Sequence, residues 1–443
     1  MKLYSTKNST AFVDLKEAVI KGLPDDNGLF MPSEIPTLPR GFIENIENYS
    51  FQEIAFEVSK TLLQGAIPEN ELQNIIKNAV SFPAPVVKLD DSVSILELFH
   101  GPSLAFKDFG ARFMAQLMSY FNQNESKELV ILVATSGDTG GAVAAGFHKT
   151  PGIRVIILYP SGKVSPLQEK QLTTLGHNIT ALEVDGTFDD CQALVKKAFL
   201  DKELTSKIRL SSANSINIAR LIPQSFYYFE AYKQLKSLNK PIVFCVPSGN
   251  FGNLTAGLLA KKMGLPVHKF IAATNSNAVV PEYLASGNYN PRPSVRTISN
   301  AMDVGSPSNF ARMYDIFSSE KGNPSPNSST WDTMKSDISG YSFDDLATKK
   351  GLKEVYEKHN YVIDPHGSVG YLALKEYQKT NPNTHGVVLE TAHPSKFIAD
   401  VEAILNQKID IPERLACLSD KQKEATFMPI NFDSFKDWLS KNC

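Results

Sequence analysis

The sequence of 443 residues has no long apolar run. No stretch approaches the roughly 18 consecutive apolar residues that a bilayer-spanning helix needs, so we predict no membrane segment. The first 22 residues mix lysines and acids with apolar side chains, which breaks up the continuous apolar core that a secretion signal requires. We therefore expect a cytoplasmic protein.

The sequence also lacks an excess of charge of one sign and closely paired cysteines. The formal net charge is only −2, which leaves no basic field for a nucleic-acid partner. The four cysteines form neither a CxxC pair nor a disulfide framework, so we predict free thiols and no metal site. A hydrophobic fraction of 42% with 21% charged residues is ordinary for a globular chain of two or three domains.

Apolar strands that alternate with amphipathic helices dominate the chain beyond its first ninety residues. The strands are expected at residues 129–135, 155–159, 179–184, 242–246, 270–274 and 387–390. This alternation predicts parallel sheets with helices on both faces, an α/β fold. Before it, helices are expected at 51–63 and 69–79. Between 294 and 340 the abundance of Ser, Asn, Pro and Gly predicts long loops.

The first segment that carries chemistry is HGPSLAFKDFG, residues 100–110. Phe106, Phe109 and Phe113 follow helical spacing, so Lys107 would begin a helix with apolar neighbours. A partly desolvated lysine has a lowered pKa, which suits imine formation and proton transfer. The alternative is a solvated lysine on a helix surface.

The second segment is PSGNFGN, residues 247–253, between an expected strand and a helix from Leu254. Its glycines would let the backbone approach an anion, and the helix N-terminus would offer unpaired N–H groups. The alternative is a tight strand-to-helix turn. Neither GxGxxG nor GxxxxGK[ST] occurs, so no dinucleotide or nucleoside triphosphate fingerprint is present.

Two further segments have a similar setting. ATSGDTGG, residues 134–141, offers hydroxyls at a helix start and suits a carboxylate or phosphate, or it simply caps the helix. In NSINIAR, Ser215, Asn217 and Arg220 could converge on the first turn of a helix that runs toward Leu235. Arginine is suited to a bidentate oxyanion contact, although an arginine so placed is often only a surface residue.

Together these segments are far more specific than any one of them. AFKDF, SGDTG and GNFGN resemble the fold-type II pyridoxal-phosphate (PLP) enzymes, and HGPSLAFKDFG, SANSINIAR and SNAMDVGSPSN resemble the threonine synthase family over nearly the whole chain. The resemblance implies two parallel-sheet α/β domains and a small, mainly helical N-terminal domain. The expected division is an N-terminal helical domain at 1–92, a large PLP-binding domain at 93–110 and 241–410, a smaller α/β domain able to move at 111–240, and a C-terminal tail at 411–443.

The resemblance also implies residue roles. Lys107 would bind the cofactor covalently and then act as acid and base. The cofactor phosphate would be held by the amides of Gly249, Asn250, Phe251, Gly252 and Asn253, the pyridine nitrogen would contact Thr391, and the 3′-oxygen would lie near Asp138. The substrate carboxylate would be bound by Thr135, Ser136, Gly137 and Thr139. The substrate phosphate would be bound by Ser215, Asn217 and Arg220.

At position 138 the chain departs from many relatives, which carry Asn there. An ionised carboxylate cannot donate a hydrogen bond to a phenolate oxygen. Asn300, Asp303 and His366 match family wording and are assigned only to the surroundings of the site, and His393 is either part of it or a capping or packed histidine.

The reaction implied is conversion of O-phospho-L-homoserine and water into L-threonine and phosphate, by a monomer or homodimer whose partner is this small substrate. The alternatives are another fold-type II lyase, such as threonine or serine dehydratase, and a catalytically silent ligand-binding relative. A phosphate site at Ser215 and Arg220 argues against the dehydratase, because hydroxyamino acids carry no phosphate.

Overall fold

The computed structural model describes residues 1–135, 137–322 and 327–443. Its large sheet has six strands in the order β12-β11-β10-β13-β5-β4, all parallel except the edge strand β4. The strands are β4 (Val86–Lys88), β5 (Val93–Glu97), β10 (Ile242–Pro247), β11 (Lys269–Thr274), β12 (Ile338–Ser342) and β13 (His385–Glu390). The central ones are buried on both faces, which explains their unbroken apolar sequences.

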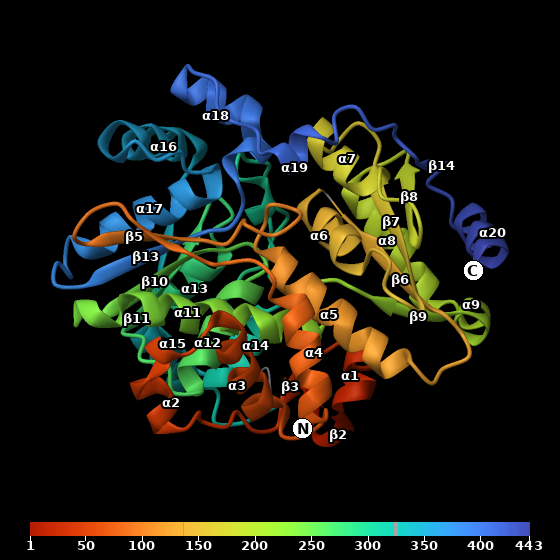
Figure 1. Cartoon of the computed structure of the whole chain (residues 1–443), viewed down its shortest axis with the longest axis horizontal. Helices are drawn as coiled ribbons and strands as arrows, with labels where there is room; N and C mark the ends of the chain where they lie inside the picture. Colours follow the sequence, from red (N-terminus) through yellow and green to blue (C-terminus); the bar gives the residue numbers. More distant parts are fainter. Residues whose placement is uncertain (136, 323–326) are drawn as a thin grey trace.

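The second sheet has five parallel strands in the order β14-β8-β7-β6-β9. They are β6 (Leu129–Ala134), β7 (Ile153–Pro160), β8 (Ile179–Val184), β9 (Arg209–Ser212) and β14 (Thr426–Met428). Figure 1 shows the large sheet on the left, this smaller sheet on the right, and helix α5 (Lys107–Asn122) between them. The predicted α/β fold with two parallel sheets is confirmed.

Helices cover both sheets. Those around the smaller sheet are α6 (Asp138–Phe147), α7 (Pro166–Thr173), α8 (Phe188–Leu200), α9 (Lys202–Lys207) and α20 (Phe432–Asn442). Those around the larger one include α11 (Phe226–Leu235), α12 (Gly252–Lys262), α13 (Val279–Ser286), α14 (Phe310–Phe317), α15 (Ser328–Asp337), α16 (Asp345–His359), α17 (Pro365–Gln378) and α18 (Ile398–Leu405). Within the polar region 294–340, residues 294–309 form a long loop as predicted, interrupted only by the 3₁₀ turn η4 (Asn300–Met302). The prediction of long loops was wrong where α14, α15 and the start of β12 lie.

The N-terminal segment contains the two predicted helices, α3 (Phe51–Leu63) and α4 (Glu69–Ala79), with α1 (Leu15–Lys21) and α2 (Arg40–Glu44). It also contains a three-stranded antiparallel sheet of β1 (Lys2–Ser5), β2 (Asn8–Asp14) and β3 (Phe30–Pro32). This sheet was not predicted, because its strands are short and two of them belong to the first fourteen residues.

The helix expected from Asn217 toward Leu235 is broken into three pieces. These are α10 (Ile218–Leu221), the 3₁₀ turn η2 (Ile222–Ser225) and α11. Pro223 accounts for the interruption because it has no N–H to continue the α-helical hydrogen-bond pattern.

Candidate active site

Lys107 lies in the loop-to-helix junction that follows β5 and is the first residue of α5, as predicted. The loop before it is fastened to the segment after β13: Phe106 N donates to Thr391 O at 2.9 Å, and His393 N donates to Leu104 O at 3.0 Å. The Lys107 side chain is 17% exposed. Burial lowers the pKa of Lys107 and so favours the neutral amine needed for nucleophilic chemistry.

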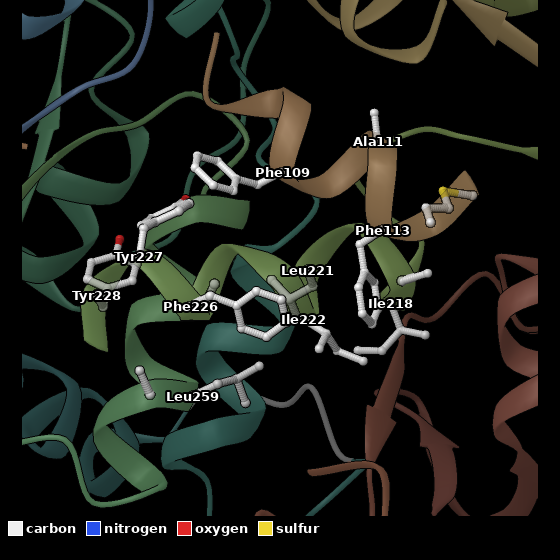
Figure 2. Close-up of a cluster of buried hydrophobic side chains, with 14 of the residues drawn as sticks. Phe109, Ala111, Phe113, Ile218, Leu221, Ile222, Phe226, Tyr227, Tyr228 and Leu259 are labelled. Carbon is white, nitrogen blue, oxygen red and sulfur yellow. The ribbon is translucent and has the colours of Figure 1, made fainter. Parts of the chain in front are cut away.

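An aromatic and aliphatic cluster fixes the helix that begins at Lys107. Figure 2 shows side chains of α5 packed against those of α10, η2 and α11. The ring centroids of Phe109 and Tyr227 lie 5.3 Å apart, and those of Phe113 and Phe226 lie 5.8 Å apart. Because α10 also carries Arg220, this buried contact sets the position of the lysine relative to the arginine.

Asp138, the first residue of α6, forms an ion pair with Lys107. Its Oδ2 lies 3.7 Å from Lys107 Nζ, while its Oδ1 accepts from Lys396 Nζ at 2.7 Å and from Gln168 Nε2 at 3.0 Å. Burial by itself would raise the pKa of Asp138, but Lys396 and Lys107 together hold that pKa well below its usual range. The carboxylate is therefore ionised and acts only as an acceptor.

The loop between β10 and α12 has the features of an anion cradle. Helix α12 begins at Gly252, so the first N–H groups of that turn have no acceptor within the helix. Phe251, just before it, adopts the left-handed conformation with φ 59°. A Cβ on Gly249 would lie 2.6 Å from the carbonyl oxygen of Ala301, so only glycine fits there.

Unused donors beside this loop suit a phosphate. A Cβ added to Gly252 would be in ordinary contact with Asn309 Nδ2 at 3.4 Å, so Asn309 lies next to the backbone at the start of α12. Asn309 Nδ2 and Asn253 Nδ2 are buried donors without a partner among the described residues. Unused donors around a helix N-terminus suit the phosphate of PLP, because an anion would satisfy them.

The loop between β6 and α6 is built around Thr135. Its Oγ1 accepts from Gly137 N at 3.0 Å and from Gly140 N at 2.8 Å. The Thr135 hydroxyl therefore has the capping role that the sequence offered as the alternative to ligand binding. Gly137 has φ 140°, which favours glycine. Thr139 lies in the first turn of α6, and Ser136, assigned to substrate binding, lies outside the described residues.

The three residues assigned to the substrate phosphate have different surroundings. Arg220 is 2% exposed; Nη1 donates to Ala213 O at 2.6 Å and Nε has no partner among the described residues. Burial lowers the pKa of Arg220 to about 10. Asn217 is already committed, since its Oδ1 caps α10 and its Nδ2 donates to Val19 O at 2.8 Å.

Ser215 joins the two predicted phosphate sites. Its Oγ accepts from Asn250 Nδ2 at 3.0 Å, and Asn250 Oδ1 in turn accepts from Ser308 N at 2.7 Å. The segment before α10 and the loop before α12 are thus in direct contact, which their separation in the sequence did not indicate.

The remaining predicted residues divide into one near the lysine and others in supporting networks. Thr391 is 7% exposed and lies beside the loop before Lys107. His366 donates from Nδ1 to Asp364 at 2.7 Å and accepts from Ala301 N at 3.2 Å, so it fastens the segment over Gly249. Asp303 accepts from Thr297 and Asn275, whereas Asn300 is exposed. His393 caps the 3₁₀ turn that begins directly after His393.

Sequence reasoning missed Lys396 and Gln168, which both contact Asp138. Lys396 lies in the 3₁₀ turn η5 (Pro394–Phe397), where a lysine normally points to solvent, and Gln168 reads only as a capping-box partner. No local pattern could have found them, because their partner is 30 residues from Gln168 and much farther from Lys396.

Among the described residues no helix is both long and apolar enough to cross a bilayer.

Three family models match the chain: "Threonine synthase N terminus" at residues 2–80, "Pyridoxal-phosphate dependent enzyme" at 82–390 and "Threonine synthase, C-terminal" at 367–438. The threonine synthase of Escherichia coli is 44% identical, with 98% of each chain covered.

Solved structures agree with these matches. The crystal structure of threonine synthase from Escherichia coli superposes with a TM-score of 0.90 at 42% identity and full coverage of both chains. PLP-bound threonine synthase from Brucella melitensis superposes with a TM-score of 0.95 at 33% identity, covering 100% of this chain and 99% of that one.

Proposed function

The chain belongs to the threonine synthase family of pyridoxal-phosphate-dependent enzymes, and we propose that Lys107 is the residue that holds its cofactor. Its activity is that of a threonine synthase, which turns O-phospho-L-homoserine and water into L-threonine and phosphate. A monomeric or homodimeric state and a cytoplasmic location stay predictions.

The observation that carries the assignment of Lys107 is a mostly buried amine with a carboxylate and an arginine charge nearby. The carboxylate of Asp138 lies 3.7 Å from its nitrogen, and Arg220 is close enough for its charge to help lower the pKa of Lys107. A solvated surface lysine, the alternative from sequence, has neither neighbour nor burial. An amine that loses its proton readily can form the bond to the cofactor and can later move protons.

The remaining cofactor contacts follow from the loops around this lysine. The N–H groups of Gly249 to Asn253 would hold the cofactor phosphate at the start of α12. Thr391, beside the loop before Lys107, would give a neutral hydroxyl to the pyridine nitrogen. Asp138 would lie near the 3′-oxygen. Its negative charge there would be compensated by Lys396 rather than by a hydrogen bond to the cofactor.

For the substrate, we propose Thr135, Gly137 and Thr139 for the carboxylate, whereas Ser136, which was assigned with them, lies outside the described residues. We propose Arg220 and Ser215 as the direct contacts of the phosphate, with Asn217 fixing the turn that presents them. A buried arginine with an unused Nε donor supports this choice, because a bound oxyanion would satisfy both its charge and its hydrogen bond. A dehydratase would have no use for such a site.

When bound, PLP supplies the electron sink that makes the carbons next to the substrate amino group acidic. Lys107 Nζ would then take the proton from Cα and afterwards one from Cβ, which allows phosphate to leave Cγ. Arg220 would stabilise the departing phosphate. Return of one proton to Cγ, addition of the hydroxyl of water at Cβ and return of a proton to Cα complete the reaction, and the packing around α5 and α6 would exclude water until then.

Two measurements test the assignment. Borohydride reduction of the protein with PLP, followed by peptide mass spectrometry, should place the cofactor on Lys107. Phosphate release from O-phospho-L-homoserine should be lost in Lys107→Ala, while its circular dichroism matches that of the wild type. Cofactor attached to another lysine, or substantial synthase activity in Lys107→Ala, would refute the assignment.

A further inference from the structure

Lys396 is a buried lysine for which the function proposed above gives no direct role. Its side chain is 1% exposed, and its Nζ donates to Asp138 Oδ1 at 2.7 Å and to Ser103 O at 2.9 Å. An unpaired ammonium in such a place would be costly, so the pairing with a carboxylate is needed for burial. The lysine thereby connects η5, after β13, with α6 and with the loop that precedes Lys107.

The two lysines share one carboxylate unequally. Asp138 Oδ1 is in hydrogen-bonded contact with Lys396, whereas Oδ2 is 3.7 Å from Lys107 Nζ. The negative charge of Asp138 is thus balanced by the closer ammonium. If Lys396 were absent, the same carboxylate would serve as the counter-ion of Lys107 and would favour its protonated form.

We propose that Lys396 is a positioning residue that neutralises Asp138 and so keeps the nitrogen of Lys107 easily deprotonated. This inference rests on the proposed function in one respect, namely that Lys107 is the residue bonded to the cofactor. It also accounts for the acid at position 138: its charge is acceptable so near the reacting amine because a second cation compensates it.

The other charges around Lys107 agree with this role. Burial lowers the pKa of Lys107, Asp138 raises it, and Lys396 and Arg220 both lower it. Asp138 comes from α6, Lys396 from η5 and Arg220 from α10, so each element that brings a charge to the lysine is included. Asp108, next to it on α5, accepts from Ser103 N at 2.8 Å, and the charge of Lys396 also acts on this carboxyl.

The test is a pH titration of the full-length holoenzyme, followed by the visible absorbance of bound PLP, which reports protonation of the Lys107 nitrogen. In Lys396→Met the titration midpoint should rise by about one unit or more, because Asp138 becomes the partner of Lys107. Lys396→Arg keeps the charge and should titrate near the wild type. Lys233→Met, which removes a lysine paired with Glu230 on α11, is the control and should not shift the midpoint.

A second pair of variants keeps the test decisive if Lys396→Met does not fold. Asp138→Asn leaves the ammonium of Lys396 without its counter-ion and should lower the midpoint. Adding Lys396→Met to Asp138→Asn removes that ammonium and should raise the midpoint again by about one unit. Equal midpoints within this pair, or between wild type and Lys396→Met, would show that Lys396 has a purely structural role and would overturn the proposal.

The two proposals fail in different ways. If borohydride places the cofactor on Lys107 but the midpoints do not respond to Lys396, only the role of Lys396 is refuted. If the cofactor of the wild-type protein is attached elsewhere, the proposed function is refuted and the role of Lys396 with it.

Discussion

Charged side chains that are almost completely buried mark the site at the scale of single residues. Arg220, Lys396 and Asp138 are each less than one-tenth exposed. A protein normally buries such groups only when partners or a ligand compensate them. Lys396 and Asp138 compensate each other, whereas Arg220 retains a donor for a ligand.

Arg220→Ala should lower kcat/KM for O-phospho-L-homoserine by about ten- to a hundredfold, because charge-assisted hydrogen bonds are worth roughly 1.5–3 kcal/mol. Part of the loss should appear in kcat, since the arginine would stabilise the departing phosphate. Steady-state kinetics beside a PLP titration measure this. Arg209→Ala, which removes an arginine of β9 that donates to Asn122 at the end of α5, is the control. Weak PLP binding with normal turnover per bound cofactor would mean that the two phosphate sites have been exchanged.

The buried carboxyl of Asp108 should make the stability of the protein depend on pH. Burial raises the pKa of Asp108 from 3.8 to about 6, although Ser103 opposes this by hydrogen bonding. The native state therefore holds this proton more tightly than the unfolded chain, and the stability that it contributes is lost as the pH rises from about 4 to about 6. The loss is about 3 kcal/mol.

Asp108→Asn keeps the neutral form at every pH. Its free energy of unfolding should approach that of the wild type near pH 4 and exceed it by about 3 kcal/mol at pH 8. Urea unfolding of both proteins across this range measures the difference. A difference that does not change with pH would contradict the raised pKa of Asp108.

At the scale of elements, helix starts build the site. Helices α5, α6, α10 and α12 all begin beside it, each after the C-terminal end of a strand or a loop that follows one. Helix N-termini carry partial positive charge and free N–H groups, so their convergence favours the anionic groups of cofactor and substrate.

The start of α12 allows the cofactor cradle to be tested apart from folding. Gly252→Val should weaken PLP binding by at least about tenfold, or about 1.4 kcal/mol, because a side chain would fill the space for the phosphate. Its Cβ meets no protein atom closer than 3.4 Å, so the fold should persist. Fluorescence titration with PLP gives the affinity.

Two other glycines serve as comparisons for Gly252→Val. Gly249→Val should destabilise the protein itself, since its Cβ would lie 2.6 Å from a backbone oxygen. Gly41→Val, where nothing lies within 4 Å, should leave PLP affinity unchanged. A folded Gly252→Val protein with normal PLP affinity would exclude this loop as the phosphate site.

At the scale of the whole molecule, the two ends of the chain are built into the sheets and the site. The last segment adds β14 to the edge of the smaller sheet, beside β8, and α20 packs on α8. Near the other end, Val19 accepts the hydrogen bond of Asn217, and Phe30 accepts from the buried Arg312. β14 and α20 are thus part of the smaller sheet layer, whereas Arg414, earlier in the segment 411–443, donates to His100 O and Gly101 O in the loop before Lys107. The division into domains stays a prediction.

Phe435→Ala should lower the free energy of unfolding by about 3–5 kcal/mol, because Phe435 is fully buried where α20 meets the smaller sheet. Phe427→Ala removes a side chain that is 61% exposed and should change it by no more than about 0.5 kcal/mol. Chemical denaturation gives both values. Hydrogen exchange should show the greatest loss of protection in β8 and α8; equal effects of the two substitutions would contradict the docking of α20.

The sequence by itself determined the elements and the kind of chemistry. Buried parallel strands are apolar throughout, so β6, β8 and β10 could be located within a residue. Lys107 was correctly placed at the first turn of a helix, since its apolar neighbours repeat at helical spacing. The four motifs also predicted PLP and the threonine synthase family, which the comparisons confirm.

Only the tertiary structure decided which side chains meet. The contact of Lys396 with Asp138 and that of Asn250 with Ser215 join segments far apart in the chain, and no periodicity encodes them. Local patterns report how a segment hydrogen-bonds to itself and which face it buries. The compensation of a buried charge depends instead on the packing of separate elements, and it is this packing that sets the protonation of Lys107.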